Sequence, residues 1–368
     1  MRVLYDHQVF SLQDAGGVSR YHYELVRYLT TAPDVQTNLF LGMNRTVYPF
    51  RELSSPNTRV TSFGPRLRPG GQRYVVNEVL SNSIAPFLGR MDVYHPTLYR
   101  SMPLVRARRV VATHHDCTHE RFPEMFPRAS RILRDKQSLY SRADAIICVS
   151  ESSRKDLLAF YNLDKAKTRV IHHGITPLPC CPAQASRLRE QLQREYVLYV
   201  GHRAAYRLFN SLLQAFHETG LHTSLNLLVL GGGPLTSEEK TLIAELGLRE
   251  SVVSMATVSD ELLAEAYASA KLFVYPSLAE GFGFPPLEAM AAGCPVLASY
   301  TSSIPEVCRD APFYFYPADQ GSFARSLLQA VNDEEARVKS IHRGRAVAGE
   351  YSWEKCGGET LALYRECS

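Results

Sequence analysis

The sequence lacks several patterns that mark common protein classes. No apolar run approaches the roughly 20 residues that a membrane-spanning helix needs, so we do not expect an integral membrane protein. The first residues, Met1–Asp6, enter a strand-like run without the basic and apolar regions of a signal peptide, so we expect no secretion signal. The eight cysteines are sparse and contain no Cys-x-x-Cys pair, which favours reduced cytosolic thiols over a disulfide scaffold.

Charge is unevenly distributed along the 368 residues. Residues 1–172 carry 25 Lys and Arg against 15 Asp and Glu, a net +10, whereas residues 173–368 carry 16 against 22, a net −6. This asymmetry indicates two domains that meet different partners. The basic half suits anionic lipid or a phosphate-bearing substrate, and the alternative is an ordinary solvated surface.

Strand-like apolar runs alternate with amphipathic helix-like segments through most of the chain, which predicts α/β domains with parallel sheets. The alternation breaks at residues 174–183, where three prolines stand in ten positions. We therefore predict two Rossmann-like, doubly wound domains facing each other across a cleft. The predicted parts are a first domain at 1–174, a linker at 175–194, a second domain at 195–350 and a C-terminal segment at 351–368.

The individual elements are predicted from the hydrophobic period. The predicted strands are 2–5, 37–41, 93–95, 110–113, 145–149, 169–171, 196–200, 225–230, 252–255, 272–275, 295–298 and 313–315. The predicted helices are 19–30, 71–88, 129–141, 151–161, 209–218, 238–246, 260–268, 286–292, 320–331 and 333–350, and Ser150 is a suitable N-cap for the fourth of them.

Two glycine turns follow predicted strands. Gly16 and Gly17 stand between the first strand and the first helix, where backbone N–H groups can approach an anion. The pair does not make a G-x-G-x-x-G pattern, so it is a weak dinucleotide signal and is compatible with a simple tight turn. The turn at residues 231–233 is open to the same two interpretations.

A histidine pair ends the strand predicted at 110–113. One imidazole there can hydrogen-bond a hydroxyl near a reacting centre. Metal binding is the competing interpretation, with His119 nearby. Because adjacent side chains of a strand point to opposite sides, His114 and His115 are poorly placed to share a metal ion.

Arg203 and Arg207 follow the first strand of the second half. Arginine stays charged and donates in a bidentate fork, so two of them four residues apart suit a diphosphate clamp. Two ordinary surface arginines are the alternative.

The segment at residues 280–296 is the strongest signal. A predicted strand leads into a glycine loop bearing Glu280, and Pro286 and Glu288 fall in the first turn of the helix that follows. A helix N-terminus favours an anion, and the two carboxylates can accept hydrogen bonds from sugar and ribose hydroxyls. One ligand satisfies every part of this segment, namely a nucleoside diphosphate sugar.

The nine residues EGFGFPPLE at 280–288 resemble the E-x7-E signature of retaining glycosyltransferases of family 4, which have the GT-B fold. The resemblance covers nearly the whole chain and is nearest to bacterial mannosyltransferase-like enzymes of O-antigen and exopolysaccharide assembly. Further blocks that resemble the family, in chain order, are YDHQVFSLQDAGGVSRYHYEL, THHDCTHERFPEMF, ADAIICVSESSRKDLL, VLYVGHRAAYRLF, LVLGGGP and SSIPEVCRDAPFYFYPAD.

The resemblance implies roles for matching positions. His115 would lie by the donor sugar and the reacting anomeric carbon, and Arg203 and Arg207 would hold the diphosphate and stabilise the leaving group. Glu280 would bind sugar hydroxyls and Glu288 the ribose. The remaining implied donor-site residues are Gly16, Gly17, Thr257, Val258, Gly281, Phe282, Gly283 and Phe284, with Thr257 and Val258 near the base. The C-terminal segment would cross back to the first domain, anchored by Trp353.

The resemblance also implies the reaction: a hexosyl group moves with retention from a nucleotide sugar to a hydroxyl of a lipid-linked or oligosaccharide acceptor, forming an α-linkage in surface polysaccharide. GDP-mannose is the first choice of donor, with UDP-GlcNAc, UDP-glucose and UDP-galactose as alternatives. The chain has no Asp-x-Asp sequence, so we expect catalysis without metal or cofactor. We expect a cytoplasmic protein, peripheral to an anionic membrane surface, with no nucleic-acid partner. A sugar-nucleotide epimerase and an inactive GT-B scaffold are the competing interpretations.

Overall fold

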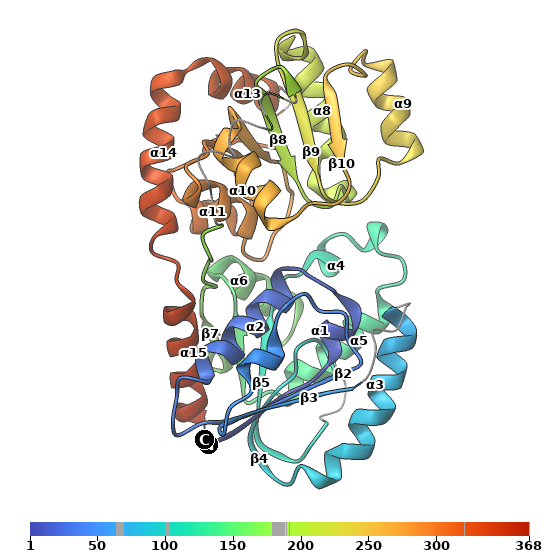
Figure 1. Ribbon diagram of the computed structural model, residues 1–368, viewed down its shortest axis with the longest axis vertical. Coiled ribbons are helices and arrows are strands. Elements are labelled where there is room, and N and C mark those ends of the chain that lie inside the picture. The colour runs from blue at the N-terminus through green and yellow to red at the C-terminus, as the bar shows by residue number, and fades with distance from the viewer. Residues whose placement is uncertain are drawn as a thin grey trace. The chain divides into compact units, whose positions relative to one another are not determined.

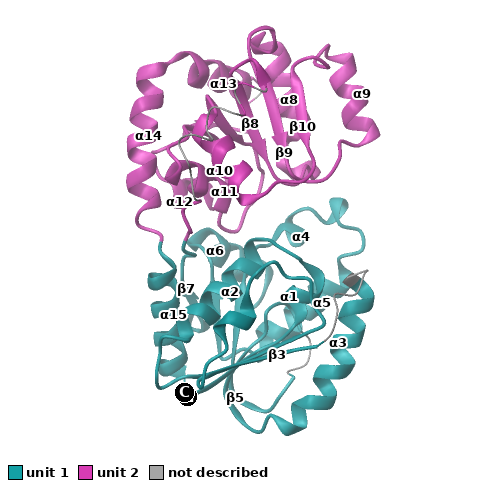
Figure 2. Cartoon of the chain, in the orientation of Figure 1, with its two compact units in different colours: residues 1–174, 352–368 teal, residues 175–351 magenta. Residues whose placement is uncertain are grey.

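The computed structural model describes residues 1–63, 70–100, 104–178, 188, 190, 192–319 and 321–367. The chain divides into two compact units, coloured separately in Figure 2. Unit 1 comprises Met1–Gly174 and Ser352–Ser368, and unit 2 comprises Ile175–Tyr351. Residues 179–187, 189 and 191 of the predicted linker lie outside the described residues.

Unit 1 contains a seven-stranded parallel sheet in the order β3-β2-β1-β4-β5-β6-β7 (Figure 1). The strands are β1 Arg2–Tyr5, β2 Gln36–Gly42, β3 Thr58–Ser62, β4 Met91–His95, β5 Ala107–His114, β6 Ala145–Cys148 and β7 Thr168–Val170. Six of them confirm predicted strands. Sequence reasoning missed β3, an edge strand whose residues TRVTS bury only Thr58 and so show no apolar run.

The helices of unit 1 lie between these parallel strands in the chain, except for the C-terminal helix α15. They are α1 Gln8–Leu12, α2 Gly17–Leu29, α3 Gly70–Ile84, α4 Thr118–Arg121, α5 Ser130–Arg142, α6 Glu151–Phe160 and α15 Trp353–Cys367, with short 3-10 turns η1 Phe50–Leu53, η2 Ala85–Phe87, η3 Pro123–Met125 and η4 Lys165–Lys167. Ser150 caps α6 as predicted, because its Oγ accepts a hydrogen bond from the Ser153 N–H at 2.9 Å.

The C-terminal helix α15 packs against α2. A Cβ on Gly357 would come 2.3 Å from the Tyr28 ring, so the two helices approach closely only because this position is glycine. The Tyr364 hydroxyl hydrogen-bonds the Tyr5 hydroxyl at 2.6 Å and His95 Nδ1 at 2.5 Å. The last part of the chain therefore completes the core of unit 1, and the sequence did not predict that it is helical.

Unit 2 contains a six-stranded parallel sheet in the order β10-β9-β8-β11-β12-β13. The strands are β8 Tyr196–Val200, β9 Asn226–Leu230, β10 Val252–Met255, β11 Leu272–Tyr275, β12 Val296–Ser299 and β13 Phe313–Phe315, each at a predicted position. The helices are α8 Phe209–Glu218, α9 Ser237–Glu245, α10 Asp260–Ser269, α11 Phe284–Ala291, α12 Ile304–Cys308, α13 Ser322–Asn332 and α14 Glu334–Ala348, with η5 Ala205–Arg207 and η6 Leu221–Thr223. Apolar residues of α8, α9 and α13 share one buried core with the sheet.

Counted from the first strand of each unit, the first six strands of unit 1 have the same order as the six strands of unit 2, and β7 is added at the edge of unit 1. The order reverses between β1 and β4 in unit 1 and between β8 and β11 in unit 2. In such sheets ligands bind outside the carboxyl ends of the strands at this reversal. The loops after these four strands are therefore the places to examine. None of the described helices has the length and apolarity that crossing a membrane requires.

Candidate functional site

A cation and a carboxylate meet at the strand reversal of unit 2. Arg207 ends the turn η5 after β8, and Glu280 lies in the loop after β11. Glu280 Oε1 is 3.2 Å from Arg207 Nη2, and it also accepts a hydrogen bond from Ser277 Oγ at 3.0 Å. The structure thus brings together two of the predicted site residues that are 73 positions apart in the chain.

The Arg207 guanidinium retains an unused donor. The rings of Tyr206 and Tyr275 lie 5.7 and 5.9 Å from its central carbon. Burial disfavours the cation, but Tyr275 and Glu280 outweigh that effect and raise the pKa of Arg207 above its ordinary value. Its Nε is buried and has no hydrogen-bond partner within the described part of the chain. A permanent cation with an unpaired buried N–H is suited to an anionic oxygen.

Arg203 holds the glycine turn after β9. Its Nε donates to Glu239 Oε1 at 2.8 Å, its Nη1 to the Gly231 carbonyl at 2.9 Å, and its Nη2 to the carbonyls of Gly233 and Pro234 at 3.1 and 2.9 Å. The side chain is only 4% exposed. Arg203 therefore fixes the shape of this turn, and its predicted contact with a diphosphate stays a prediction.

The glycine turn leaves no room for side chains at its centre. Gly232 has φ +72°, and a Cβ there would lie 2.5 Å from the Gly201 carbonyl oxygen. Glycine is required because the turn packs directly on the backbone of the loop after β8. The loop after β8 and the glycine turn after β9 are therefore packed together at the carboxyl edge of the sheet.

Hydroxyl groups after β12 hold the loop that carries Glu280. Ser302 Oγ accepts from the Glu280 N–H at 2.9 Å, and Ser303 Oγ donates to the carbonyls of Glu280 and Phe282 at 2.8 and 3.0 Å. Sequence reasoning missed these positioning residues and Ser277. The run of hydroxyl side chains directly after a predicted strand was the available signal.

The helix after this loop begins earlier than predicted. The structure starts α11 at Phe284, two residues before the predicted Pro286, so Glu288 lies in the second turn and not in the first. Gly283 occupies the N-cap with φ +103° and supplies no side-chain cap. The helix α11 thus begins directly after the loop of Glu280 and has no acidic residue in its first turn. Glu288 itself is half-buried.

The remaining donor-site predictions in unit 2 fall on the same sheet edge. Thr257 is exposed and Val258 half-buried in the loop after β10, the outermost strand of the sheet. The Gly231 N–H donates to the Met255 carbonyl at 2.9 Å, which joins this strand end to the glycine turn. Along this sheet edge, the glycine turn after β9 therefore lies between Arg207, which follows β8, and Thr257 and Val258, which follow β10.

In unit 1, His115 lies beside the helix that the Gly16–Gly17 turn begins. Its ring centre is 5.8 Å from that of Tyr21 and 6.3 Å from that of His22, and both of these residues belong to α2. The His173 ring stacks on it at 6.1 Å. The structure thus brings His115 close to α2, at whose exposed N-terminus Gly16 and Gly17 lie.

His114 points away from His115, as the strand geometry predicted. Its Nδ1 hydrogen-bonds the Tyr140 hydroxyl at 2.8 Å in the core formed with α5. In the described ranges, no three His, Cys, Asp or Glu side chains are arranged to hold a metal ion.

Comparison with known proteins decides the family. Residues 15–177 match the family model "Glycosyltransferase Family 4", and residues 182–347 match "Glycosyl transferases group 1". The chain is 33% identical over 285 residues to the O-antigen chain mannosyltransferase B of Escherichia coli, with 74% of each chain covered. The chain belongs to glycosyltransferase family 4.

The chain has the GT-B fold, and solved structures share this fold over nearly its whole length. Sucrose-phosphate synthase from Thermosynechococcus elongatus has a TM-score of 0.77 at 20% identity, with 99% of this chain and 98% of that chain covered. HepE from Anabaena, solved with UDP and glucose, also has a TM-score of 0.77, at 18% identity and with both chains fully covered. At these identities the likeness establishes the fold of this family 4 glycosyltransferase.

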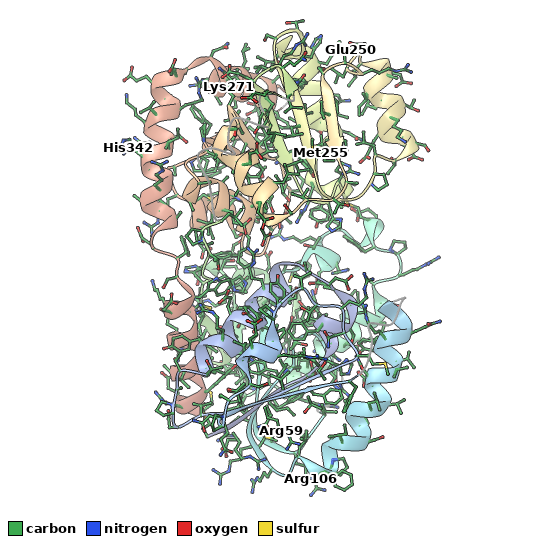
Figure 3. The ribbon with its side chains drawn as sticks, in the orientation of Figure 1. Arg59, Arg106, Glu250, Met255, Lys271 and His342 are labelled. Atoms are coloured by element: carbon green, nitrogen blue, oxygen red, sulfur yellow. The ribbon has the colours of Figure 1, made fainter. Side chains whose placement is uncertain are left out.

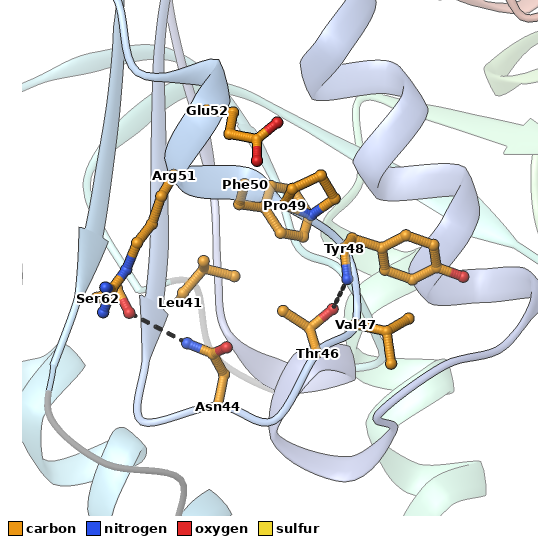
Figure 4. A pocket seen from close by; sticks show the side chains of 10 residues that line it. All are labelled: Leu41, Asn44, Thr46, Val47, Tyr48, Pro49, Phe50, Arg51, Glu52 and Ser62. Carbon is orange, nitrogen blue, oxygen red and sulfur yellow. Dashed lines mark hydrogen bonds between the residues drawn. The ribbon is translucent and has the colours of Figure 1, made fainter.

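A pocket of about 490 Å³ adjoins the Gly16 turn of the glycosyltransferase (Figure 4). The Tyr48 hydroxyl donates to the Gly16 carbonyl at 3.3 Å, and Asn44 Nδ2 donates to Ser62 Oγ at 3.2 Å across the pocket. The pocket opens where β2 and β3 end, on the same sheet edge as His115. Its lining combines aromatic, amide, hydroxyl and charged groups, namely Leu41, Asn44, Thr46, Val47, Tyr48, Pro49, Phe50, Arg51, Glu52 and Ser62.

The cluster of four histidines, His22, His95, His115 and His173, has neutral imidazole rings at pH 7. Burial lowers the pKa of His115 to about 4, with Asp116 opposing and Lys136 adding to the shift. Burial and His115 lower the pKa of His95 to about 3, and burial places those of His22 and His173 well below their ordinary value. A neutral His115 can both accept and donate a hydrogen bond to a sugar hydroxyl.

These shifts predict that unit 1 loses stability in acid. In the unfolded chain these histidines bind protons below a pH of about 6.5, whereas in the folded protein they stay neutral. The free energy of unfolding that they contribute is therefore fully present above that pH and falls as the pH drops toward 4. Each such imidazole contributes a slope of up to about 1.4 kcal/mol per pH unit. Denaturant unfolding across this range measures the slope. We expect His22→Gln to reduce this slope and His342→Gln, at an exposed position of α14, to leave it unchanged. A free energy of unfolding that does not change with pH would contradict the prediction.

Proposed function

We propose that the protein transfers a mannosyl group from GDP-mannose, with retention, to a hydroxyl of a lipid-linked or oligosaccharide acceptor. The product would be an α-linkage in a surface polysaccharide, made in the cytoplasm. The mannosyl choice is supported by the 33% identity with an O-antigen mannosyltransferase. The transfer chemistry is supported most directly by the Arg207–Glu280 pair at the strand reversal of unit 2.

Arg207 and the N-terminus of α11 meet the charge that the reaction creates. The bond between the anomeric carbon and the phosphate oxygen breaks, and the leaving diphosphate gains negative charge. Preorganised donors aimed at such charge are among the strongest catalytic effects. Arg207 has a buried unused N–H for this purpose, and Glu280 keeps the guanidinium oriented while its carboxylate accepts from sugar hydroxyls.

The acceptor hydroxyl forms the new bond on the same face of the sugar, and its proton passes to the leaving phosphate oxygen. Neutral His115 would hydrogen-bond the sugar near the reacting carbon. The pocket beside Gly16 would hold a sugar unit of the acceptor, because aromatic, amide and charged groups together suit a carbohydrate. Since arginine supplies the charge and the chain has no Asp-x-Asp, we propose that no metal takes part.

A nucleotide panel tests the donor. Thermal unfolding is followed with GDP, UDP, dTDP and ADP, each with Mg²⁺ and with EDTA. We expect GDP alone to raise the unfolding midpoint equally in both conditions and Arg207→Ala to remove the shift. A ligand at 100 times its Kd adds about 2.7 kcal/mol to stability, which is readily measured. Transfer from GDP-mannose to methyl α-mannoside, with the product's anomeric configuration read by NMR, tests retention.

A UDP-sugar is the second candidate donor. HepE, with the same fold, is solved with UDP-glucose, at 19% identity. A shift by UDP alone would replace GDP-mannose with a UDP-sugar and leave the transferase proposal standing. A product of inverted configuration would contradict retention. No shift with any nucleotide and no transfer would contradict the transferase proposal itself.

A further inference from the structure

Two tyrosines form an exposed aromatic pair in unit 2. Tyr300 and Tyr316 are 48% and 53% exposed, and their ring centres lie 5.1 Å apart with 46° between the ring planes. Within the described part of the chain, the other exposed aromatic side chains are Phe87 and Phe160, and both belong to unit 1. Exposed apolar surface that gathers in one place marks an interaction site.

The arrangement of the two rings is set by contacts within unit 2. The Tyr300 N–H donates to the Phe315 carbonyl at 2.8 Å, which fixes Tyr300 beside the residue that precedes Tyr316. The Tyr314 ring meets the Tyr300 ring edge-on at 5.1 Å, and its hydroxyl donates to the Arg309 carbonyl at 2.6 Å. Because the rings are already held in place, a ligand that binds them loses little free energy to ordering them.

The tyrosine pair lies at the carboxyl edge of the sheet in unit 2. Tyr300 directly follows β12, and Tyr316 directly follows β13, the outermost strand on that side. Figure 3 marks both edges of this sheet, because Met255 ends β10 at the carboxyl edge, whereas Glu250 and Lys271 precede strands at the amino edge. The pair therefore lies on the edge that carries the candidate functional site.

One short loop joins the tyrosine pair to that site. Thr301 Oγ1 donates to the Ser277 carbonyl at 2.8 Å, and Ser302 Oγ accepts from the Glu280 N–H at 2.9 Å. Tyr300 comes two residues before Ser302, a separation of at most about 7 Å along the chain. A saccharide that has one unit near Glu280 can therefore reach Tyr300 with a neighbouring unit.

The chemistry of the pair fits a neutral sugar. A pyranose carries C–H groups on its faces and hydroxyls around its rim, and C–H groups are attracted to the negative face of an aromatic ring. In the described residues, the hydroxyls of Tyr300 and Tyr316 have no hydrogen-bond partner, so both can bond the rim. Unit 2 carries 14 Lys and Arg against 19 Asp and Glu, a net −5, which disfavours a nucleic acid or an anionic lipid surface.

We propose that Tyr300 and Tyr316 form a stacking platform for sugar units of the glycan acceptor that lie beyond the reacting unit. The glycan as occupant rests on the proposed function. Each extra unit that stacks adds to the binding of the same chain, so longer acceptors bind more tightly. Two tyrosine rings are far smaller than the roughly 800 Å² that each partner buries in a stable protein interface, so a second protein fits less well.

Calorimetric titration of the full chain tests the platform without any donor. The ligands are methyl α-mannoside, an α-linked mannohexaose and maltohexaose, the last because stacking does not require one particular hexose. We expect a hexasaccharide to bind at least about tenfold more tightly than methyl α-mannoside. Tyr300→Ala and Tyr316→Ala should each weaken hexasaccharide binding about tenfold, the usual effect of losing one well-packed aromatic contact, and leave methyl α-mannoside unaffected. Tyr300→Phe and Tyr316→Phe should keep most of the binding, because the ring remains.

Phe160→Ala is the matched control. It removes an aromatic side chain that is 47% exposed at the end of α6 in unit 1, and it should leave the binding of every ligand unchanged. Thermal unfolding at the wild-type midpoint shows that each variant is folded. Equal affinity for short and long ligands, no binding of either hexasaccharide, or wild-type binding by the double alanine variant would overturn the platform.

Two further outcomes separate the platform from its alternatives. A dimer in light scattering that Tyr316→Ala converts to a monomer, with no length dependence in glycan binding, would assign the surface to a second copy and overturn the platform. Length-dependent binding that requires both tyrosines, in a protein that transfers no sugar from any nucleotide, would support the platform and reject the proposed function. Failure of the transferase proposal and failure of the platform are therefore distinguishable.

Discussion

Arg207→Ala is expected to lower kcat for sugar transfer by about 10²–10³-fold, the usual cost of removing one preorganised donor to a developing charge. The expected loss is in kcat because the diphosphate gains its charge as the bond breaks. Glu280 would also lose its partner 3.2 Å away and would stand near the leaving group as an unbalanced negative charge. Steady-state kinetics at saturating donor and acceptor measure the change. Arg207→Lys should recover only part of it, because an ammonium lacks the planar fork.

Arg325→Ala is the matched control for this prediction. Arg325 is an exposed arginine of α13 in the same unit, and it pairs with Asp319 at 2.6 Å on the surface. Such pairs contribute little, so kcat and stability should stay at wild-type values. A double variant of Arg207→Ala and Glu280→Gln should lose less than the sum of the two separate effects, because the side chains are in contact. A kcat within about threefold of wild type for Arg207→Ala would show that Arg207 does not meet the leaving group.

The placement of Arg207 and Glu280 was predictable because local patterns determine it. Apolar runs identified β8 and β11, and in a parallel sheet the residues after such strands share one edge. The bond from Arg203 to Glu239 was not predictable, because Glu239 lies in the first turn of α9 and not after a strand end. The sequence near Glu239 shows only a helix cap, formed with Thr236. Only the tertiary structure shows that the Arg203 side chain hydrogen-bonds the glycine turn.

The same distinction applies to whole elements. The helix α8 was predicted with its observed bounds because its apolar residues recur at helical spacing. Helix α15 contains two adjacent glycines, Gly357 and Gly358, which weaken any helical prediction. Gly357 is required because Tyr28 of α2 occupies the space where its side chain would be, 2.3 Å from the Cβ position. In α15, the low helix propensity of glycine is outweighed by the packing contact with Tyr28, which the local sequence does not reveal.

Lys136→Met is expected to lower the free energy of unfolding of unit 1 by about 3–5 kcal/mol, the typical cost of breaking a buried ion pair from one side. Lys136 is fully buried, and its Nζ donates to Glu120 Oε1 and to the Asp116 carbonyl, both at 2.9 Å. Burial disfavours the ammonium, but Tyr99, Asp116 and Glu120 together hold the pKa of Lys136 above its ordinary value. Without Lys136 the Glu120 carboxylate, whose side chain is 6% exposed, keeps the Tyr161 hydroxyl as its one donor among the described residues. Denaturant unfolding measures the loss.

Adding Glu120→Gln to Lys136→Met should restore most of the lost stability, because a neutral amide can still accept from Tyr161 and no unpaired charge remains. Lys339→Met, which breaks an exposed pair with Glu335 on α14, should change stability by less than about 0.5 kcal/mol.

The double variant of Lys136→Met and Glu120→Gln also separates an effect on folding from an effect on catalysis. Lys136 holds the Asp116 carbonyl, next to His115, so kcat should stay low even where stability returns. Recovery of both would show that Lys136 only balances a buried charge, and a single variant as stable as wild type would show that Glu120 is neutralised in another way.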